Sequence, residues 1–143
     1  MSCVHDIIAI SGQAVRAHIA YKDAPDGYQH ISKDIAALQV LINKVAQYFK
    51  STNISSHDHQ YGQKLWNSCQ TVLADLNSFI EKYKRLAAIN KGFIFGTVKL
   101  GNRDITALHS QLISQTVLMN SFIRRFVVPA MYSRVLYVFY VEY

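Results

Sequence analysis

Residues 31–49 read ISKDIAALQVLINKVAQYF, and this stretch decides the fold class. Apolar side chains recur there in alternating steps of four and three residues, at Ile31, Ile35, Leu38, Ile42, Val45 and Phe49. Because an α-helix has about 3.6 residues per turn, this spacing brings them onto one face. The stretch therefore predicts an amphipathic helix with one buried side. Two starts fit the sequence, with Ser32 as the N-cap or slightly earlier near Asp26.

Three further stretches show helical periodicity. The first has an expected buried face of Val4, Ile7, Ile8, Val15, Ile19 and the stem of Lys22. It ends near KDAPDG, residues 22–27, because proline and glycine interrupt a helix. The stretch after Asn53 has an expected face of Tyr61, Leu65, Cys69, Val72, Leu76, Phe79, Tyr83 and Leu86. The last starts near Asn102, with one polar member in an expected face of Ile105, Leu108, Leu112, Gln115, Met119, Phe122 and Phe126.

Four amphipathic helices joined by short connections bury their apolar faces most simply as an antiparallel four-helix bundle of the all-α class. We predict a bundle domain over residues 1–126 and a short hydrophobic C-terminal tail over residues 127–143. Pro129 is expected to separate the tail from the bundle, and the run VLYVFYV at residues 135–141 is typical of a strand. The segment 90–101, with three glycines, fits either a structured loop or a broken helix.

The composition predicts an intracellular, cytoplasmic globular protein. Half of the 143 residues are hydrophobic, and the two cysteines, Cys3 and Cys69, lie in helical stretches where they resemble small buried residues. Asp6 and the lack of a preceding basic run distinguish the N-terminus from a secretory signal. The longest stretch without charged residues, 105–123, contains several polar side chains, so we do not expect it to span a membrane.

Positive charge is concentrated in the second half of the chain. The net charge is +6, and residues 82–134 contain nine Lys and Arg against a single acid, Asp104, whereas residues 1–81 contain six against seven acids. This asymmetry favours an anionic partner, although a solvated basic face is the alternative. The residues expected to contact an anionic partner or lipid are Lys82, Lys84, Arg85, Arg124 and Arg125.

Several motifs come close to a functional site without completing one. GTVKLG at residues 96–101 has phosphate-loop glycine spacing, but Asn102 and Arg103 replace the required Lys and Ser/Thr. His57, Asp58 and His59 are adjacent on a helix, where consecutive side chains point in different directions. No serine has a nucleophile-elbow context. We therefore expect no catalytic, cofactor-binding or metal site and no small-molecule substrate.

The sequence resembles the helical N-terminal domain of fungal NLR-like (STAND) proteins over about residues 4–126. The resemblance rests on dispersed positions. These are residues 6–11 (DIIAIS), 20–25 (AYKDAP) with Tyr28, Ile31 and Ser32, 62–65 (GQKL) with Cys69 and Gln70, Leu73, 75–77 (DLN), 81–83 (EKY), 98–101 (VKLG), Asp104, Ile105 and 122–125 (FIRR).

The resemblance implies a signalling or effector domain. In that family the domain precedes a NACHT-type nucleotide-binding module or ankyrin repeats, and some HeLo-like relatives are cell-death effectors that attack membranes. This chain departs from the family after Arg125, where a nucleotide-binding module would follow.

We therefore expect a non-catalytic helical signalling and interaction domain that binds a protein partner or a second copy. The alternative is a membrane-active effector that binds anionic lipid. Nucleic-acid binding comes third, because Tyr83, beside Lys82 and Lys84, already belongs to the expected core face.

Overall fold

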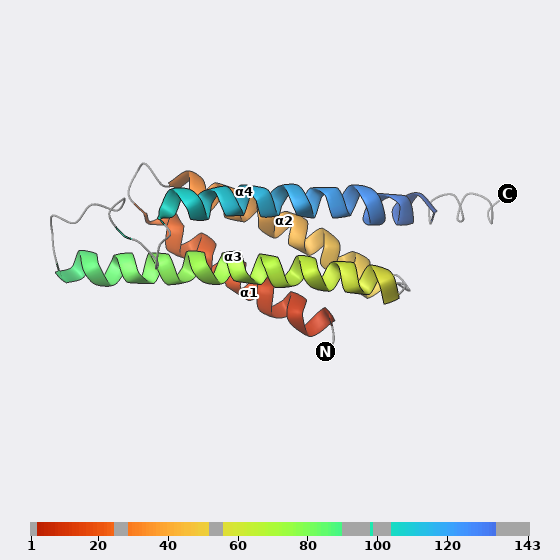
Figure 1. Ribbon diagram of the computed structural model, residues 1–143, viewed down its shortest axis with the longest axis horizontal. Helices are drawn as coiled ribbons and strands as arrows, with labels where there is room; N and C mark the ends of the chain where they lie inside the picture. The colour runs from red at the N-terminus through yellow and green to blue at the C-terminus, as the bar shows by residue number, and fades with distance from the viewer. Residues whose placement is uncertain (1–2, 25–28, 52–55, 90–97, 99–103, 134–143) are drawn as a thin grey trace.

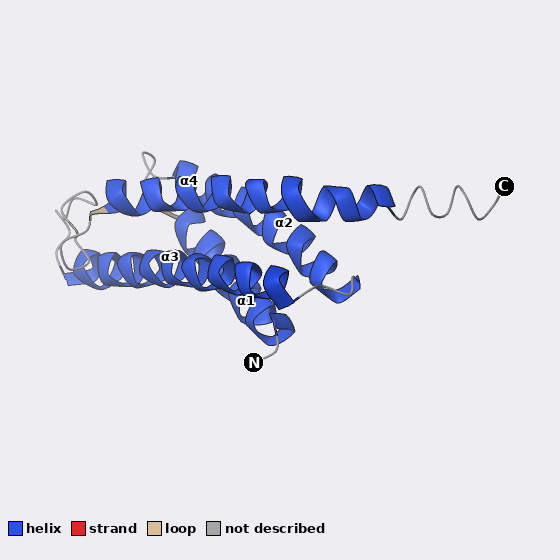
Figure 2. Cartoon of the chain, turned by 45° about the vertical axis from the view of Figure 1, so that its right-hand side comes forward, coloured by secondary structure: helices blue, strands red, loops and turns tan. Residues whose placement is uncertain are grey.

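The computed structural model describes residues 3–24, 29–51, 56–89, 98 and 104–133. These residues form α1 (Cys3–Lys22), α2 (Gln29–Ser51), α3 (Ser56–Ile89), α4 (Ile105–Phe122) and a short π-helix, η2 (Ile123–Val127). The four α-helices form a bundle, which confirms the predicted all-α class (Figure 1). The described part of the chain contains no strand (Figure 2).

The helices alternate in direction along the chain. In Figure 1, α1 and α3 run one way, and α2 and α4 run the other way. α1 packs against both α2 and α3, and α4 also packs against both of these helices. The bundle therefore combines antiparallel neighbours, such as α1 with α2, and parallel neighbours, such as α1 with α3.

The buried face of α2 confirms the prediction from residues 31–49. The six apolar residues of its stripe are at most 9% exposed, and five of them are fully buried. Of the two predicted starts, the structure favours the earlier one near Asp26 over an N-cap at Ser32, because α2 begins at Gln29 and Ser32 is buried inside it. The Ser32 hydroxyl instead donates a hydrogen bond to the carbonyl of His18 in α1, at 3.2 Å.

The expected buried face of α1 is wrong, although α1 ends at Lys22 as predicted. Ile8 and Ile19 are about 60% exposed, and the helix instead buries Ile10, Ala14, Ala17 and Tyr21. The two alanines let α1 approach its neighbours closely, so the bulkier β-branched side chains lie outside. The side chains of Val4 and Ile7 lie outside the described part of the structure.

Tyr21 joins α1 to α3. Its hydroxyl donates a buried hydrogen bond to the carbonyl of Leu76, at 2.9 Å. Burial raises the pKa of this phenol, so it stays protonated at neutral pH.

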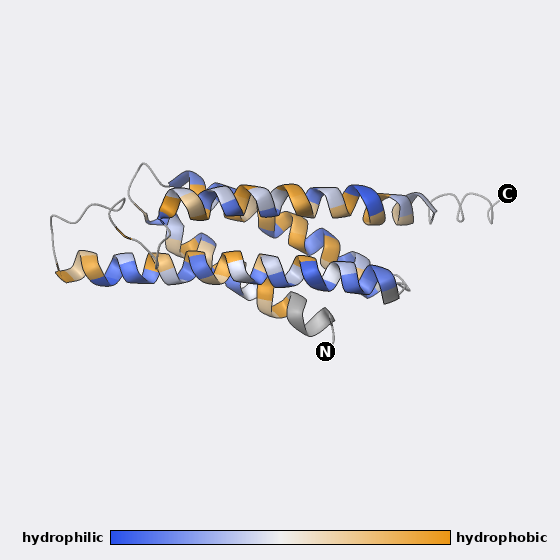
Figure 3. Ribbon diagram, in the orientation of Figure 1, coloured by the Kyte–Doolittle hydropathy of each residue, from blue (hydrophilic) through white to orange (hydrophobic). Residues whose placement is uncertain are grey.

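The 34 residues of α3 span about 51 Å, and their buried face is wider than predicted. Leu65, Cys69, Val72, Leu76 and Phe79 are buried as expected, whereas Tyr61 is 40% exposed and Tyr83 and Leu86 are partly buried. A second row of buried side chains, Trp66, Leu73 and Ile80, was not predicted. Because α3 packs against both α1 and α4, it buries both rows. Figure 3 shows hydrophobic and hydrophilic residues interspersed along this helix.

The predicted face of α4 is confirmed, including its polar member. Gln115 is 2% exposed, and its amide is satisfied within the core: Ser68 Oγ donates to Oε1 at 2.7 Å and Nε2 donates to the Leu65 carbonyl at 3.3 Å. Asp104 caps the helix by accepting a hydrogen bond from the Ala107 amide. Phe126 is half-buried and packs against the core.

Pro129 does not end the helical backbone. After η2 the described chain remains helical through residue 133, across the proposed boundary between residues 126 and 127. In η2 the Val128 amide bonds the Ile123 carbonyl, five residues back. A proline clashes with the carbonyl four residues before it in an α-helix, and the wider π turn relieves this crowding. Residues 135–141 and most of 90–101 lie outside the described part, so those predictions stay open.

Candidate interaction surfaces

The five expected cationic contact residues do not form one surface. Lys82, Lys84 and Arg85 lie near the C-terminal end of α3, whereas Arg124 and Arg125 lie in η2 beyond the C-terminal end of α4. Because α3 and α4 are antiparallel, these groups lie at opposite ends of the bundle, and the rise from Ile105 to Arg124 alone is about 28 Å (Figure 1). An anionic ligand smaller than the bundle can contact only one of these two groups of cationic residues.

The described residues of the incomplete motifs make other contacts in the structure. His57 is 82% exposed and lies 3.6 Å from Asp58, while the His59 ring lies 5.6 Å from that of Phe49. Among the described residues, no group of three His, Cys, Asp or Glu side chains could hold a metal ion. Of GTVKLG, only Val98 is described, and it is buried. Cys69 is a buried thiol, and burial raises its pKa to about 12.

Histidine contacts join three helices in a way that the sequence did not reveal. His109 Nε2 of α4 lies 2.6 Å from Asp34 Oδ2 of α2, and the His30 ring contacts the His109 ring edge-on at 4.7 Å. His18 Nδ1 donates to the Ser32 carbonyl at 3.0 Å. Because the residues in contact are 14 to 79 positions apart in the sequence, no local spacing could have indicated the contacts.

The outer face of α4 is the first candidate surface. It comprises the exposed residues of this helix, which are Thr106, Ala107, Ser110, Ile113, Ser114, Val117, Leu118, Asn120 and Ser121. The three large apolar side chains among them, Ile113, Val117 and Leu118, are 44%, 59% and 49% exposed. No residue of α4 is Lys, Arg, Asp or Glu, so this face is uncharged on a cationic protein.

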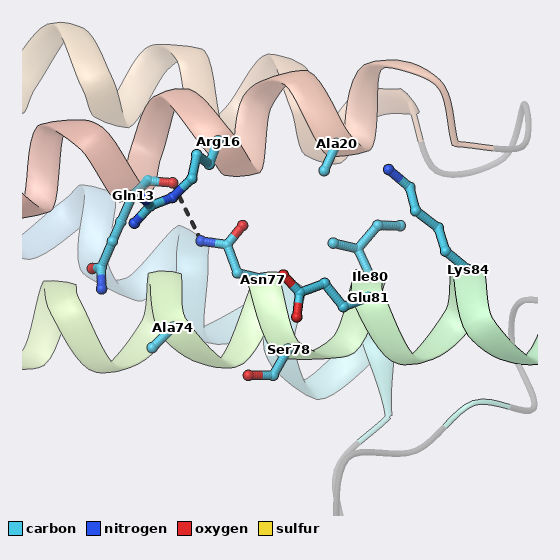
Figure 4. A pocket seen from close by; sticks show the side chains of 9 residues that line it. All are labelled: Gln13, Arg16, Ala20, Ala74, Asn77, Ser78, Ile80, Glu81 and Lys84. Carbon is cyan, nitrogen blue, oxygen red and sulfur yellow. Dashed lines mark hydrogen bonds between the residues drawn. The ribbon is translucent and has the colours of Figure 1, made fainter.

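The α1/α3 groove is the second candidate surface. It has a volume of about 470 Å³ and lies between the parallel helices α1 and α3, with Gln13, Arg16 and Ala20 on one wall and Asn77, Glu81 and Lys84 on the other (Figure 4). Asn77 Nδ2 donates to the Gln13 backbone carbonyl at 3.3 Å and thereby links the two walls. Ligand pockets in proteins commonly fall in this volume range.

Comparisons with known proteins add no family. No family model matches the chain, and neither a curated protein nor a solved structure is similar enough to count as a match. The resemblance to fungal NLR-like domains therefore stays a prediction.

No described helix combines the length and the apolar character that crossing a bilayer requires. The 18 residues of α4 carry no charge but include His109, Gln111, Gln115 and Asn120.

Proposed function

We propose that the chain is a non-catalytic helical interaction domain with a signalling role, and that two copies associate through the outer face of α4. The supporting observation is the combination of three exposed apolar side chains with the absence of charge along the whole helix. Exposed apolar area on a globular domain commonly marks an interaction site. The resemblance to N-terminal domains of fungal NLR-like proteins motivates the signalling role.

Charge limits where a second copy can bind. The chain has a net charge of +6, so most self-contacts bring like charges together, which costs several kcal/mol for close pairs. The outer face of α4 is free of that repulsion, and its small residues Ala107, Ser110 and Ser114 let two helices approach closely. A single helix face buries less than a standard interface, so we expect a dissociation constant of about micromolar or weaker.

A matched pair of variants tests the association. Val117 lies in the outer face of α4 and is 59% exposed, whereas Val40 lies on α2 and is 53% exposed. Analytical ultracentrifugation over a concentration series should show wild type rising above the monomer mass of 16.3 kDa. Val117→Lys should stay monomeric, while Val40→Lys, with the same added charge, should behave as wild type. Identical behaviour of the two variants, or a wild type that stays monomeric, contradicts the proposal.

Peripheral binding to anionic lipid is the second candidate function. It is favoured by the exposed Ile8, Val15 and Ile19 of α1, which lie at helical spacing beside the exposed Arg16. An amphipathic helix with basic residues binds anionic membranes by this combination. Sedimentation with phosphatidylserine vesicles at low and high salt tests it, with phosphatidylcholine vesicles as control. Binding that Ile19→Glu does not reduce contradicts a role for this face.

A further inference from the structure

We propose that the α1/α3 groove binds a small zwitterion, a free molecule with an acidic group at one end and a hydrogen-bond donor such as an ammonium group at the other. The proposal concerns a ligand and not a reaction. It is independent of association through α4, because the groove lies between α1 and α3.

The hydrogen bond between Asn77 and Gln13 sets the register of the two walls. Since α1 and α3 are parallel and rise about 1.5 Å per residue, Arg16 lies level with Ile80, next to Glu81, and Ala20 lies level with Lys84. The groove therefore changes character along its length. Figure 4 shows the Arg16 side chain directed toward Gln13 at one end, the Glu81 carboxylate in the middle, and Lys84 near the small Ala20 at the far end.

The far end favours an acidic group. The Lys84 side chain extends from α3 toward α1, where Ala20 leaves space (Figure 4). The Arg16 side chain is directed away from this end, toward Gln13 (Figure 4), so Lys84 is the cation of the far end. An ammonium group beside open space binds a carboxylate or phosphate through charge-assisted hydrogen bonds.

The middle of the groove and Gln13 present hydrogen-bond acceptors. Gln13 Oε1 is buried and has no hydrogen-bond partner in the described structure, although leaving such an acceptor unpaired costs about 1–3 kcal/mol. The Glu81 carboxylate also lines the groove and can only accept hydrogen bonds when ionised. An ammonium or hydroxyl group of the ligand would pair with the Glu81 carboxylate and reduce the repulsion between Glu81 and the acid, whereas Gln13 Oε1 lies farther along the groove, beyond Asn77 (Figure 4).

The floor and size fit a compact ligand. Ile80 is 2% exposed and provides an apolar base, and Ala20 and Ala74 keep the two ends open. A site with an apolar base and a few fixed polar groups is the usual form of a small-molecule pocket.

The test uses O-phosphoethanolamine as the zwitterion, with inorganic phosphate and ethanolamine as its two halves. Titrations of the full chain would be followed by backbone amide shifts in NMR spectra. O-Phosphoethanolamine should shift the amides of Asn77, Ser78 and Glu81 and bind more tightly than either half. 4-Aminobutanoate, which replaces the phosphate by a carboxylate, shows which acid the groove prefers.

Three variants at exposed positions locate the binding. Lys84→Gln should weaken O-phosphoethanolamine by about tenfold, since a charge-assisted contact is lost. Lys64→Gln, which removes an exposed lysine of the same helix outside the groove, should leave it unchanged. Glu81→Gln should weaken the zwitterion but strengthen inorganic phosphate, because repulsion of the anion disappears. Circular dichroism melting checks that each variant folds.

Two results overturn the proposal. One is the absence of saturable shifts with any of the probes. The other is equal loss of binding in Lys84→Gln and Lys64→Gln, which would indicate attraction to the overall positive charge. Opposite effects of Glu81→Gln on the two probes cannot arise from a structural defect and would support the proposal directly.

Discussion

Gly62→Ala tests how tightly the bundle is packed where α2 meets α3. Gly62 is inside α3, and a Cβ atom built there would clash with Phe49 Cζ and lie 3.2 Å from Cε1 and Cε2 of the same ring. The ring cannot move freely, because it lies against Phe122 at a centroid distance of 5.9 Å and against Trp66 at 6.1 Å. The added methyl group therefore has to displace a packed aromatic cluster.

Two opposing effects set the magnitude. Replacing glycine by alanine inside a helix favours folding by about 1 kcal/mol. Overpacking a well-filled core costs about 1–3 kcal/mol, so we expect Gly62→Ala to lower the free energy of unfolding by about 1 kcal/mol net. For a domain of this size the melting temperature should fall by about 3–5 °C.

Gly12→Ala is the matched control. Gly12 is an exposed glycine inside α1, and a Cβ atom there would meet nothing within 4 Å. Only the helix propensity changes, so this variant should stabilise the chain by about 0.5–1 kcal/mol. Opposite signs for two identical substitutions would show that the Phe49 contact decides the result.

Urea unfolding followed by circular dichroism measures both variants and a double-mutant cycle with Phe49→Leu. When a leucine side chain replaces the Phe49 ring, the clash is removed, and Gly62→Ala should stabilise that background by up to about 1 kcal/mol. A stabilising effect of Gly62→Ala in the wild-type background, or equal effects with and without Phe49→Leu, would refute the packing of Phe49 against Gly62.

Two further predictions concern the buried core. Leu38 is fully buried on α2, so Leu38→Asp should cost about 5 kcal/mol or more and abolish the cooperative melt in circular dichroism, whereas retention of that melt would contradict the α2 face. The Cys69 thiol ionises near 9 when exposed and at about 12 in the fold, so the unfolded state loses its proton first, and the raised pKa makes stability fall between these pH values. The expected slope is up to about 1.4 kcal/mol per pH unit, and Cys69→Ala should flatten it in urea unfolding series; equal slopes would contradict the burial of the thiol.

The sequence predicted helices best where one face differs clearly from the other. On α2 six large apolar residues form one unbroken stripe, which stands out although Val40 and Leu41 lie off it, so the buried face could be assigned before its neighbours were known. On α1, Ile8, Val15 and Ile19 compete with Ile10, Ala14 and Ala17, and counting apolar residues selected the bulkier set. The face with the alanines is buried because α1 lies close to α2 and α3, and which face meets those helices depends on tertiary packing.

The candidate surfaces were harder to predict than the helices, because they depend on contacts between helices that are distant in the sequence. The α1/α3 groove requires α1 and α3 to be parallel neighbours, and local periodicity contains no information on which helices become neighbours. The uncharged outer face of α4 was easier to predict, because the charge-free stretch 105–123 can be read directly from the sequence. Its significance emerged only when Ile113, Val117 and Leu118 proved to be exposed.

The positions of the two surfaces make the proposals separable. α1 and α4 each pack against both α2 and α3, so association through the outer face of α4 uses a helix that does not line the α1/α3 groove. Val117→Lys should therefore abolish self-association and leave O-phosphoethanolamine binding unchanged, while Lys84→Gln should do the reverse. If occupancy of the groove changes the dimerisation constant, the coupling has to pass through α2 or α3, which both pack against α1 and α4, and the Ser68 and Gln115 hydrogen bond is one polar contact on the α3 route.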